Sequence, residues 1–168
     1  PARAELHVWA ESAMVKVLPE RAPGAATAVN VATVRNEWEG FQVALRSDVP
    51  VAAVDVDLPV LQGPGDATIR IERTHAYRAY FIDIAEASQC FLDAKCRLAP
   101  EPFGRRPGRY PDPLVPLADP YGAEERPVGA PFDLPPDTTT AIFVDVFVPA
   151  DTVPGDYHGT LTVRAGDA

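Results

Sequence analysis

Apolar and polar residues alternate with a period of two along most of the chain, and no window shows the spacing of an amphipathic helix. Turn-forming stretches rich in Pro, Gly and Asp separate the alternating segments. The expected strands are residues 5–10, 13–18, 26–35, 38–46, 51–58, 67–73, 75–84, 140–148 and 156–164. This pattern predicts an all-β protein, an antiparallel β-sandwich of immunoglobulin-like or jelly-roll-like type.

Residues 85–138 interrupt the pattern, since they hold eleven of the 19 prolines and show no sustained periodicity. We expect a long Pro-rich loop inserted into the sandwich, because such loops in compact domains are usually functional or docked on a surface. Its centre, "RYPDPLVPLADPYG", places apolar side chains between prolines that stiffen the chain. Packing against a surface is favoured over an exposed proline-rich ligand for a recognition module.

Length and charge restrict the classes of protein and partner. The chain has 168 residues, 46% of them hydrophobic, which suits a single domain spanning 1–168 with its own core. The formal net charge is −9 and no basic block occurs, which argues against nucleic acid or an anionic membrane as a partner. The first residue is not Met and the last expected strand ends close to the end of the sequence, so we expect a piece of a longer protein.

The two cysteines, Cys90 and Cys96, bracket "FLDAK". A disulfide there would close a short loop, for which the chain-entropy model gives about 2 kcal/mol, and the alternative is a pair of reduced thiols. We predict the disulfide, which would favour a secreted or periplasmic location. No metal or other cofactor is expected, because the three histidines are scattered and the Asp55/Asp57 pair offers few of the oxygens that calcium needs.

The segment "VRNEWEGFQVALRS" raises the question of an active site. Glu37 and Glu39 would share one face of a strand at about 6–7 Å, within the range of about 5–9 Å that glycosidase carboxylates span. Two carboxylates on one strand point the same way, however, whereas a glycosidase needs them on either side of a sugar. We therefore expect Arg35 and the two glutamates to form a partly buried, ion-paired cluster near Gly40, and we predict no catalytic residue in this chain.

Several aromatic residues fall on the polar side of their strands. In "IFVDVFV", Phe143 and Phe147 alternate with the apolar positions and should point to the other side of the strand. Trp9 and Trp38 are also out of phase with the apolar residues of their own strands. Such rings can stack on a sugar, dock another domain, or form a second core layer. The docking candidates are Pro111, Asp112, Pro113, Leu114, Phe143 and Phe147. The sugar-stacking candidates are Trp9, Trp38, Tyr110 and Tyr121.

Four segments occur in an order and spacing that resembles one family. They are "LHVWAESAMVKVLPE", "ATVRNEWEGFQVALRS", "RYPDPLVPL" and "VDVFVPADTVPGDYHGTLTV". Together they resemble the N-terminal β-sandwich domain of bacterial glycoside hydrolases of the β-N-acetylgalactosaminidase type and their uncharacterised relatives. The strongest elements are the Arg-Asn-Glu-x-x-x-Phe-Gln run at 35–42, the Pro-Asp-Pro-Leu-x-Pro run at 111–116 and the Pro-Gly-x-Tyr-x-Gly hairpin at 154–159.

The resemblance implies that catalysis belongs to a (β/α)₈ barrel further along the polypeptide. It implies a non-catalytic accessory domain of a secreted carbohydrate-active enzyme, whose partner is its own C-terminal catalytic domain. The residues themselves also allow three alternative functions: a carbohydrate-binding module, a cell-surface interaction domain and a self-contained enzyme. The Cys90/Cys96 pair is not part of the family pattern.

Overall fold

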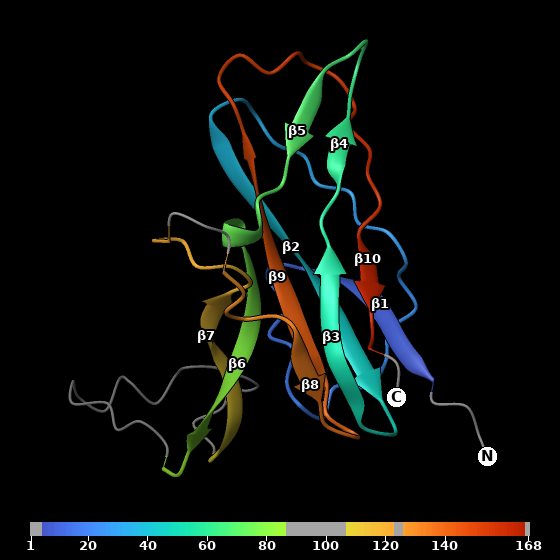
Figure 1. Ribbon diagram of the computed structural model, residues 1–168, viewed down its shortest axis with the longest axis vertical. Coiled ribbons are helices and arrows are strands. Elements are labelled where there is room, and N and C mark those ends of the chain that lie inside the picture. The colour runs from blue at the N-terminus through green and yellow to red at the C-terminus, as the bar shows by residue number, and fades with distance from the viewer. Residues whose placement is uncertain (1–4, 87–106, 123–125, 167–168) are drawn as a thin grey trace, which may run out of the picture.

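The computed structural model describes residues 5–86, 107–122 and 126–166, and in these residues the protein is built from antiparallel strands (Figure 1). The elements are β1 (Leu6–Ser12), β2 (Glu37–Ser47), β3 (Val51–Asp57), β4 (Val60–Gln62), β5 (Thr68–Arg70), the 3₁₀ turn η1 (Arg73–His75), β6 (Ala76–Ile84), β7 (Gly108–Pro116), β8 (Phe132–Leu134), β9 (Thr140–Val148) and β10 (Thr162–Arg164). A five-stranded sheet has the order β1-β2-β9-β6-β7, a three-stranded sheet has the order β10-β3-β8, and β4 pairs with β5. No helix among the described residues is long and apolar enough to cross a membrane.

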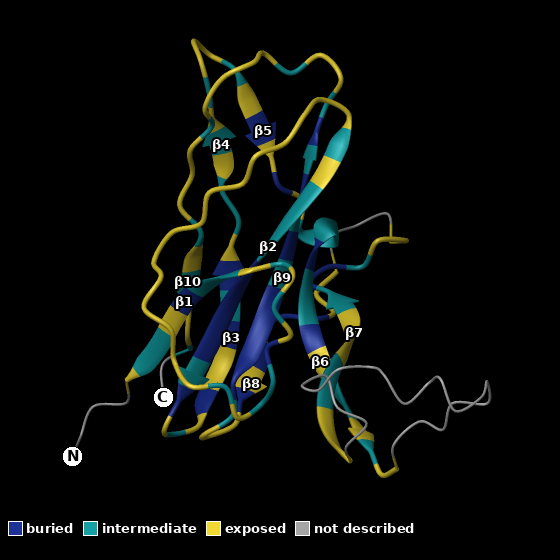
Figure 2. Ribbon diagram, turned by 180° about the vertical axis from the view of Figure 1, so that it is seen from behind, coloured by how far each residue is buried: buried dark blue, intermediate teal, exposed yellow. Residues whose placement is uncertain are grey.

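The main core lies between the five-stranded and three-stranded sheets. Alternate residues of β9 point inward, where Val144 and its neighbours meet the inner faces of β3 and β8, including Val54, Val56, Phe132 and Leu134. Figure 2 shows the buried centre of the molecule along β2, β9 and β3. Full burial of such a side chain stabilises the fold by about 1.5–3 kcal/mol. The predicted all-β, antiparallel sandwich is therefore confirmed.

A second, smaller core lies on the opposite side of the five-stranded sheet, which we call the outer face. Trp9 is only 2% exposed there and packs against Val17 and three alanines, Ala44, Ala79 and Ala141. The small side chains leave room for the indole ring. Residues 13–24 cover it: a Cβ at Gly24 would stand 2.5 Å from Cδ1 of Trp9.

Hydrogen bonds fix this covering loop to the sheet. The Gln42 amide Nε2 donates to the carbonyl oxygens of Ser12 at 2.8 Å and Val15 at 2.7 Å. The Trp9 indole N–H donates to the Glu11 carboxylate at 3.0 Å, and the Arg21 guanidinium pairs with the same carboxylate. Gln42, Trp9 and Glu11 thus tie the loop to β1 and β2.

Two of the predicted strands are wrong. Residues 13–18 form the loop over Trp9, and residues 26–35 run extended outside every sheet, with Val29, Val31 and Val34 between 37% and 68% exposed. The backbone N–H of Ala10 donates to the carbonyl of Ala26 at 2.7 Å, but no ladder follows in the described strands. Alternation of apolar and polar residues marks an extended backbone, and it does not show whether that backbone has a neighbour.

The prediction that residues 85–138 form an irregular insertion is wrong for two parts of it. Residues 108–116 form β7, which pairs with β6 at the edge of the five-stranded sheet, and residues 132–134 form β8 beside β3. An edge strand tolerates proline because one of its sides has no ladder to supply. A register shift between Ala79 and Phe81 accommodates an extra residue around Asp112 and Pro113. Cys90 and Cys96 lie outside the described residues, so their disulfide stays a prediction.

The expected ion-paired cluster at the start of β2 is also wrong. Asn36 adopts the left-handed φ of 62°, which Asn tolerates better than most residues, and its N–H donates to the Val148 carbonyl at 2.6 Å. The Glu37 carboxylate accepts from the N–H of Val34 at 2.8 Å and from the Thr33 hydroxyl at 3.0 Å. Arg35 is exposed and, within the described chain, makes no ion pair with Glu37 or Glu39. The residues before Glu37 therefore form a turn that leads directly into β2.

Candidate functional site

Beyond the part covered by residues 13–24, the outer face of the five-stranded sheet carries a cluster of rings. We call it the aromatic face, and it consists of Trp38, His75, Tyr77, Phe143 and Phe147 around Asp145. The cross-strand register explains the grouping: Trp38 is opposite Phe147, Gly40 is opposite Asp145, and Phe143 is opposite Tyr77. Because these residues alternate with the buried positions of β9, their side chains share the outer face.

The rings contact one another directly. The centroids of Trp38 and Phe147 are 4.9 Å apart at 36°, and those of Trp38 and His75 are 4.6 Å apart at 80°. Aromatic pairs at such spacing are worth about 0.5–1.5 kcal/mol beyond the area they bury. Trp38 is nevertheless 47% exposed, whereas the other rings are partly buried. The cluster is therefore an ordered surface with one wide ring presented to solvent.

The aromatic face continues onto β7. Pro116 is opposite Tyr77, Leu114 is opposite Ala79, and Pro111 is opposite Phe81. Leu114 is 45% exposed. The sheet thus brings Pro111 and Leu114 onto the same face as Phe143 and Phe147, while Asp112 and Pro113 are exposed at the register shift beside them.

Asp145 has an unusual environment for a carboxylate. Burial raises its pKa above the ordinary value, and the nearby His75 acts in the opposite direction. Burial, followed by the charge of Asp145, raises the pKa of the Tyr77 hydroxyl. In the part of the chain that the structure describes, the Asp145 carboxylate has no hydrogen-bond or ion-pair partner. It is a half-buried charge among rings.

Gly40 lies directly across from Asp145 and is required by close packing. A Cβ at this position would stand 2.9 Å from Cε1 of Phe143 and 3.1 Å from Oδ1 of Asp145. A side chain here would collide with the ring and crowd the carboxylate. The glycine therefore leaves room for the Phe143 ring beside the Asp145 carboxylate.

Sequence reasoning missed the roles of Tyr77, His75 and Asp145. The signal was available in the segment "HAYRAYF", because Tyr77 is out of phase with the buried Ala76 in the same way that Phe143 is out of phase with Ile142. Which out-of-phase residues meet depends on the strand order β2-β9-β6, and that order links segments far apart in the sequence.

The sugar-stacking candidates do not form one platform. Trp9 is buried under residues 13–24 and has no ring face available in this structure. Tyr110 is partly buried on β7 opposite Ile82, and Tyr121, after β7, is 96% exposed. Trp38 belongs to the aromatic face instead.

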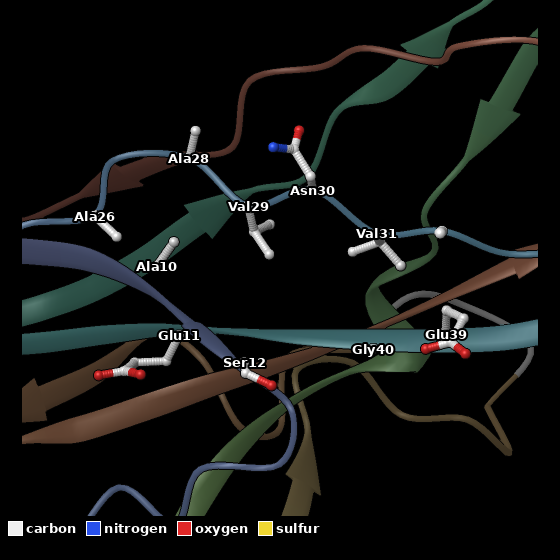
Figure 3. Close-up of a pocket in the computed structure, with 11 residues that line it drawn as sticks. Ala10, Glu11, Ser12, Ala26, Ala28, Val29, Asn30, Val31, Glu39 and Gly40 are labelled. Atoms are coloured by element: carbon white, nitrogen blue, oxygen red, sulfur yellow. The ribbon is translucent and has the colours of Figure 1, made fainter.

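An open groove of about 540 Å³ lies between residues 26–32 and the ends of β1 and β2. In Figure 3, Val29 and Val31 point toward the sheet, whereas Ala28 and Asn30 point away from it. Glu39 lines the groove, and Glu11, also at its edge, is held by Arg21 and Trp9. The Glu37 carboxylate is used in the turn before β2. The carboxylates of Glu37 and Glu11 are therefore already held by other groups of the chain.

The described part of the chain also contains no group of three or more His, Cys, Asp or Glu residues placed to hold a metal ion. Fold and surface together define an antiparallel β-sandwich domain whose most distinctive feature is an aromatic face rather than a cleft.

Comparison with known proteins adds a distant structural likeness. No family model matches the sequence, and no curated protein matches it. Among solved structures, a family 123 glycoside hydrolase from Clostridium perfringens, analysed for the hydrolysis of glycolipid glycans, matches with a TM-score of 0.62 at 12% identity. The match covers 96% of this chain and 25% of that one, so this chain spans a quarter of the length of the glycosidase. At this identity the likeness shows a shared fold.

Proposed function

We propose that this chain is a non-catalytic accessory domain of a secreted glycoside hydrolase, and that it docks on and supports a catalytic domain C-terminal to it. The support comes from the fold shared with a quarter of a family 123 glycoside hydrolase and from the sequence segments that resemble the β-N-acetylgalactosaminidase type. A secreted or periplasmic location belongs to the same proposal and is tied to the predicted Cys90–Cys96 disulfide.

The aromatic face is the observation on which the proposal rests. It crosses β2, β9, β6 and β7, four neighbouring strands, and presents Trp38 and Leu114 to solvent. Monomers rarely leave large contiguous apolar patches uncovered, and specific interfaces are enriched in Trp, Tyr and Phe. A typical specific interface buries about 1,200–2,000 Å² in total, which the outer side of several strands can supply.

In this account the sandwich contributes no group to catalysis. Its part is to bury the aromatic face against the catalytic domain and so to stabilise that domain. The acid and base would come from the (β/α)₈ barrel that the family resemblance implies.

A carbohydrate-binding module is the second candidate, and one observation favours it. Trp38 is half exposed and lies beside polar groups, His75 and Asp145, which is the combination that a sugar site uses. Its weakness is that the other predicted stacking residues, Trp9, Tyr110 and Tyr121, lie elsewhere.

Two measurements separate the candidates. The coding sequence after residue 168 should continue into a barrel-sized domain if the chain is an accessory domain, and a stop codon there would contradict docking. Titration of this chain with N-acetylgalactosamine or galactose oligomers should give no saturable signal up to millimolar concentration. A sub-millimolar dissociation constant that is lost in Trp38→Ala but kept in Tyr121→Ala would establish a binding module instead.

A further inference from the structure

We infer that the surface that docks on the aromatic face carries a basic side chain, most suitably arginine, which pairs with Asp145. This inference rests on the proposed docking function and specifies the chemistry of the partner. It starts from the position of Asp145 in the middle strand of the five-stranded sheet, flanked along β9 by Phe143 and Phe147.

A carboxylate in this position is only partly compensated, because the effect of His75 on its pKa is smaller than that of burial. Asp145 is partly buried, and the described residues offer it neither a hydrogen bond nor an ion pair. Burying a charged group without a partner is unfavourable, and docking an apolar surface over Asp145 would bury it further. A partner that covers this face must therefore supply either a positive charge or hydrogen-bond donors.

The surrounding groups favour a positive charge. Trp38 comes from β2 and His75 from η1, just before β6, so their contact spans β9 on the face that bears Asp145. Tyr77 lies near enough to Asp145 that the carboxylate charge, after burial, contributes to the raised pKa of its hydroxyl. Aromatic ring faces attract cations, and a planar guanidinium can stack on a ring while it donates two hydrogen bonds to a carboxylate. His75 is a neighbouring basic residue, and its charge acts on the Asp145 carboxylate against the effect of burial.

Overall charge agrees with this assignment. The space above Gly40 is taken by the Phe143 ring and the Asp145 carboxylate, so the ring and the carboxylate lie side by side on the outer face. The chain has a net charge of −9, so a basic partner surface would be electrostatically complementary. A sugar hydroxyl could also donate to Asp145, and the experiment below treats that as a contrary outcome.

To test this inference, the chain is titrated with ethylguanidinium, and in a separate control with ethylurea, which is neutral and similar in shape. Binding is detected by NMR, from the signals of the Gly40 amide and the Trp38 indole N–H. We expect saturable shifts with ethylguanidinium in the millimolar range and none with ethylurea. Asp145→Asn should weaken the binding about tenfold, as expected when a hydrogen bond to a charged group is removed. Asp48→Asn, which removes an exposed carboxylate from the turn between β2 and β3, should leave the binding unchanged.

Three results would overturn the inference: no saturable shift, equal shifts with ethylurea, or unchanged binding by a folded Asp145→Asn variant. Shifts with N-acetylgalactosamine in place of ethylguanidinium would overturn it in favour of a sugar site. The docking function has a separate readout, the protection of Trp38 in the longer polypeptide. Protection of Trp38 without guanidinium binding would leave docking intact and reject only the cation.

Discussion

At the level of single residues, three carboxylate side chains have three different roles. Glu37 holds the turn in which Asn36 takes a left-handed conformation, Glu11 anchors Trp9 and Arg21, and Asp145 lies among rings without a hydrogen bond or ion pair to the described residues. Spacing along the sequence could place Glu37 and Glu39 on one side of a strand. The spacing could not reveal that residues 35 and 36 form a turn and that the strand begins only at Glu37.

The turn gives a direct prediction about stability. Glu37→Ala removes two hydrogen bonds to a carboxylate and should lower the free energy of unfolding by about 1–3 kcal/mol, since both bonds are exposed to solvent and a typical hydrogen bond contributes about 0.5–1.5 kcal/mol. Arg35→Ala, two residues earlier, should change it by less than about 0.5 kcal/mol because the side chain is exposed. Urea unfolding of both variants checks this. A larger loss in Arg35→Ala than in Glu37→Ala would reinstate the ion-paired cluster.

Asp145 predicts a pH dependence. Its pKa in the folded state is raised by burial, so ionisation costs more in the folded than in the unfolded chain. The stability that the protonated form contributes is fully present below the ordinary value of 3.8 and is lost as pH rises through the folded pKa. Asp145→Asn should therefore be more stable than the wild type at neutral pH, and the difference should vanish in acid. Denaturant unfolding at both pH values tests the sign, and a less stable variant at neutral pH would refute it.

At the scale of elements, alternation predicted the long strands, because β2, β3, β6 and β9 each bury one side against a sheet. It failed for β7, whose three prolines are typical of loops but are permitted at the edge of a sheet. It also failed for residues 13–18, which cover Trp9 instead of joining a sheet. Both errors concern which segments lie next to each other in space, and the periodicity within one segment carries no information about that.

The small core under residues 13–24 predicts a contrast between the two tryptophans. Trp9→Ala should cost about 3–5 kcal/mol, because it empties a site lined by alanines that cannot close the cavity. Trp38→Ala should cost less than about 1.5 kcal/mol, since the ring is half exposed and loses mainly its aromatic contacts. Thermal or urea unfolding provides the comparison. Equal losses would mean that Trp38 belongs to the core rather than to a docking surface.

At the scale of the whole molecule, the sandwich shares its fold with a quarter of a family 123 glycoside hydrolase and carries an aromatic face on its five-stranded sheet. The sequence could identify the rings of this face as out of phase, but the strand order alone brings β2, β9, β6 and β7 together. The docking candidates Pro111, Asp112, Pro113 and Leu114 were predicted as part of a loop, and the structure places them on an edge strand of the same sheet.

The same account predicts that this chain alone does not hydrolyse aryl N-acetylhexosaminides or other aryl glycosides. Glu37 is occupied in a turn, and Glu11, which lines the groove together with Glu39, is paired with Trp9 and Arg21. The check is a release assay with the purified chain alongside Glu37→Gln and Glu39→Gln. Turnover that either substitution abolishes would contradict the prediction.

Hydroxyl-radical footprinting tests the central claim most directly. Oxidation of Trp38 and Leu114 is compared between this chain alone and the full-length product of its gene, with Tyr80 as an internal control because it is 52% exposed on the opposite side of the sheet. If the aromatic face docks on a catalytic domain, Trp38 and Leu114 are strongly protected in the full-length protein and Tyr80 is not. Equal oxidation of Trp38 in the two proteins would show that the aromatic face stays free, and the docking function would be rejected.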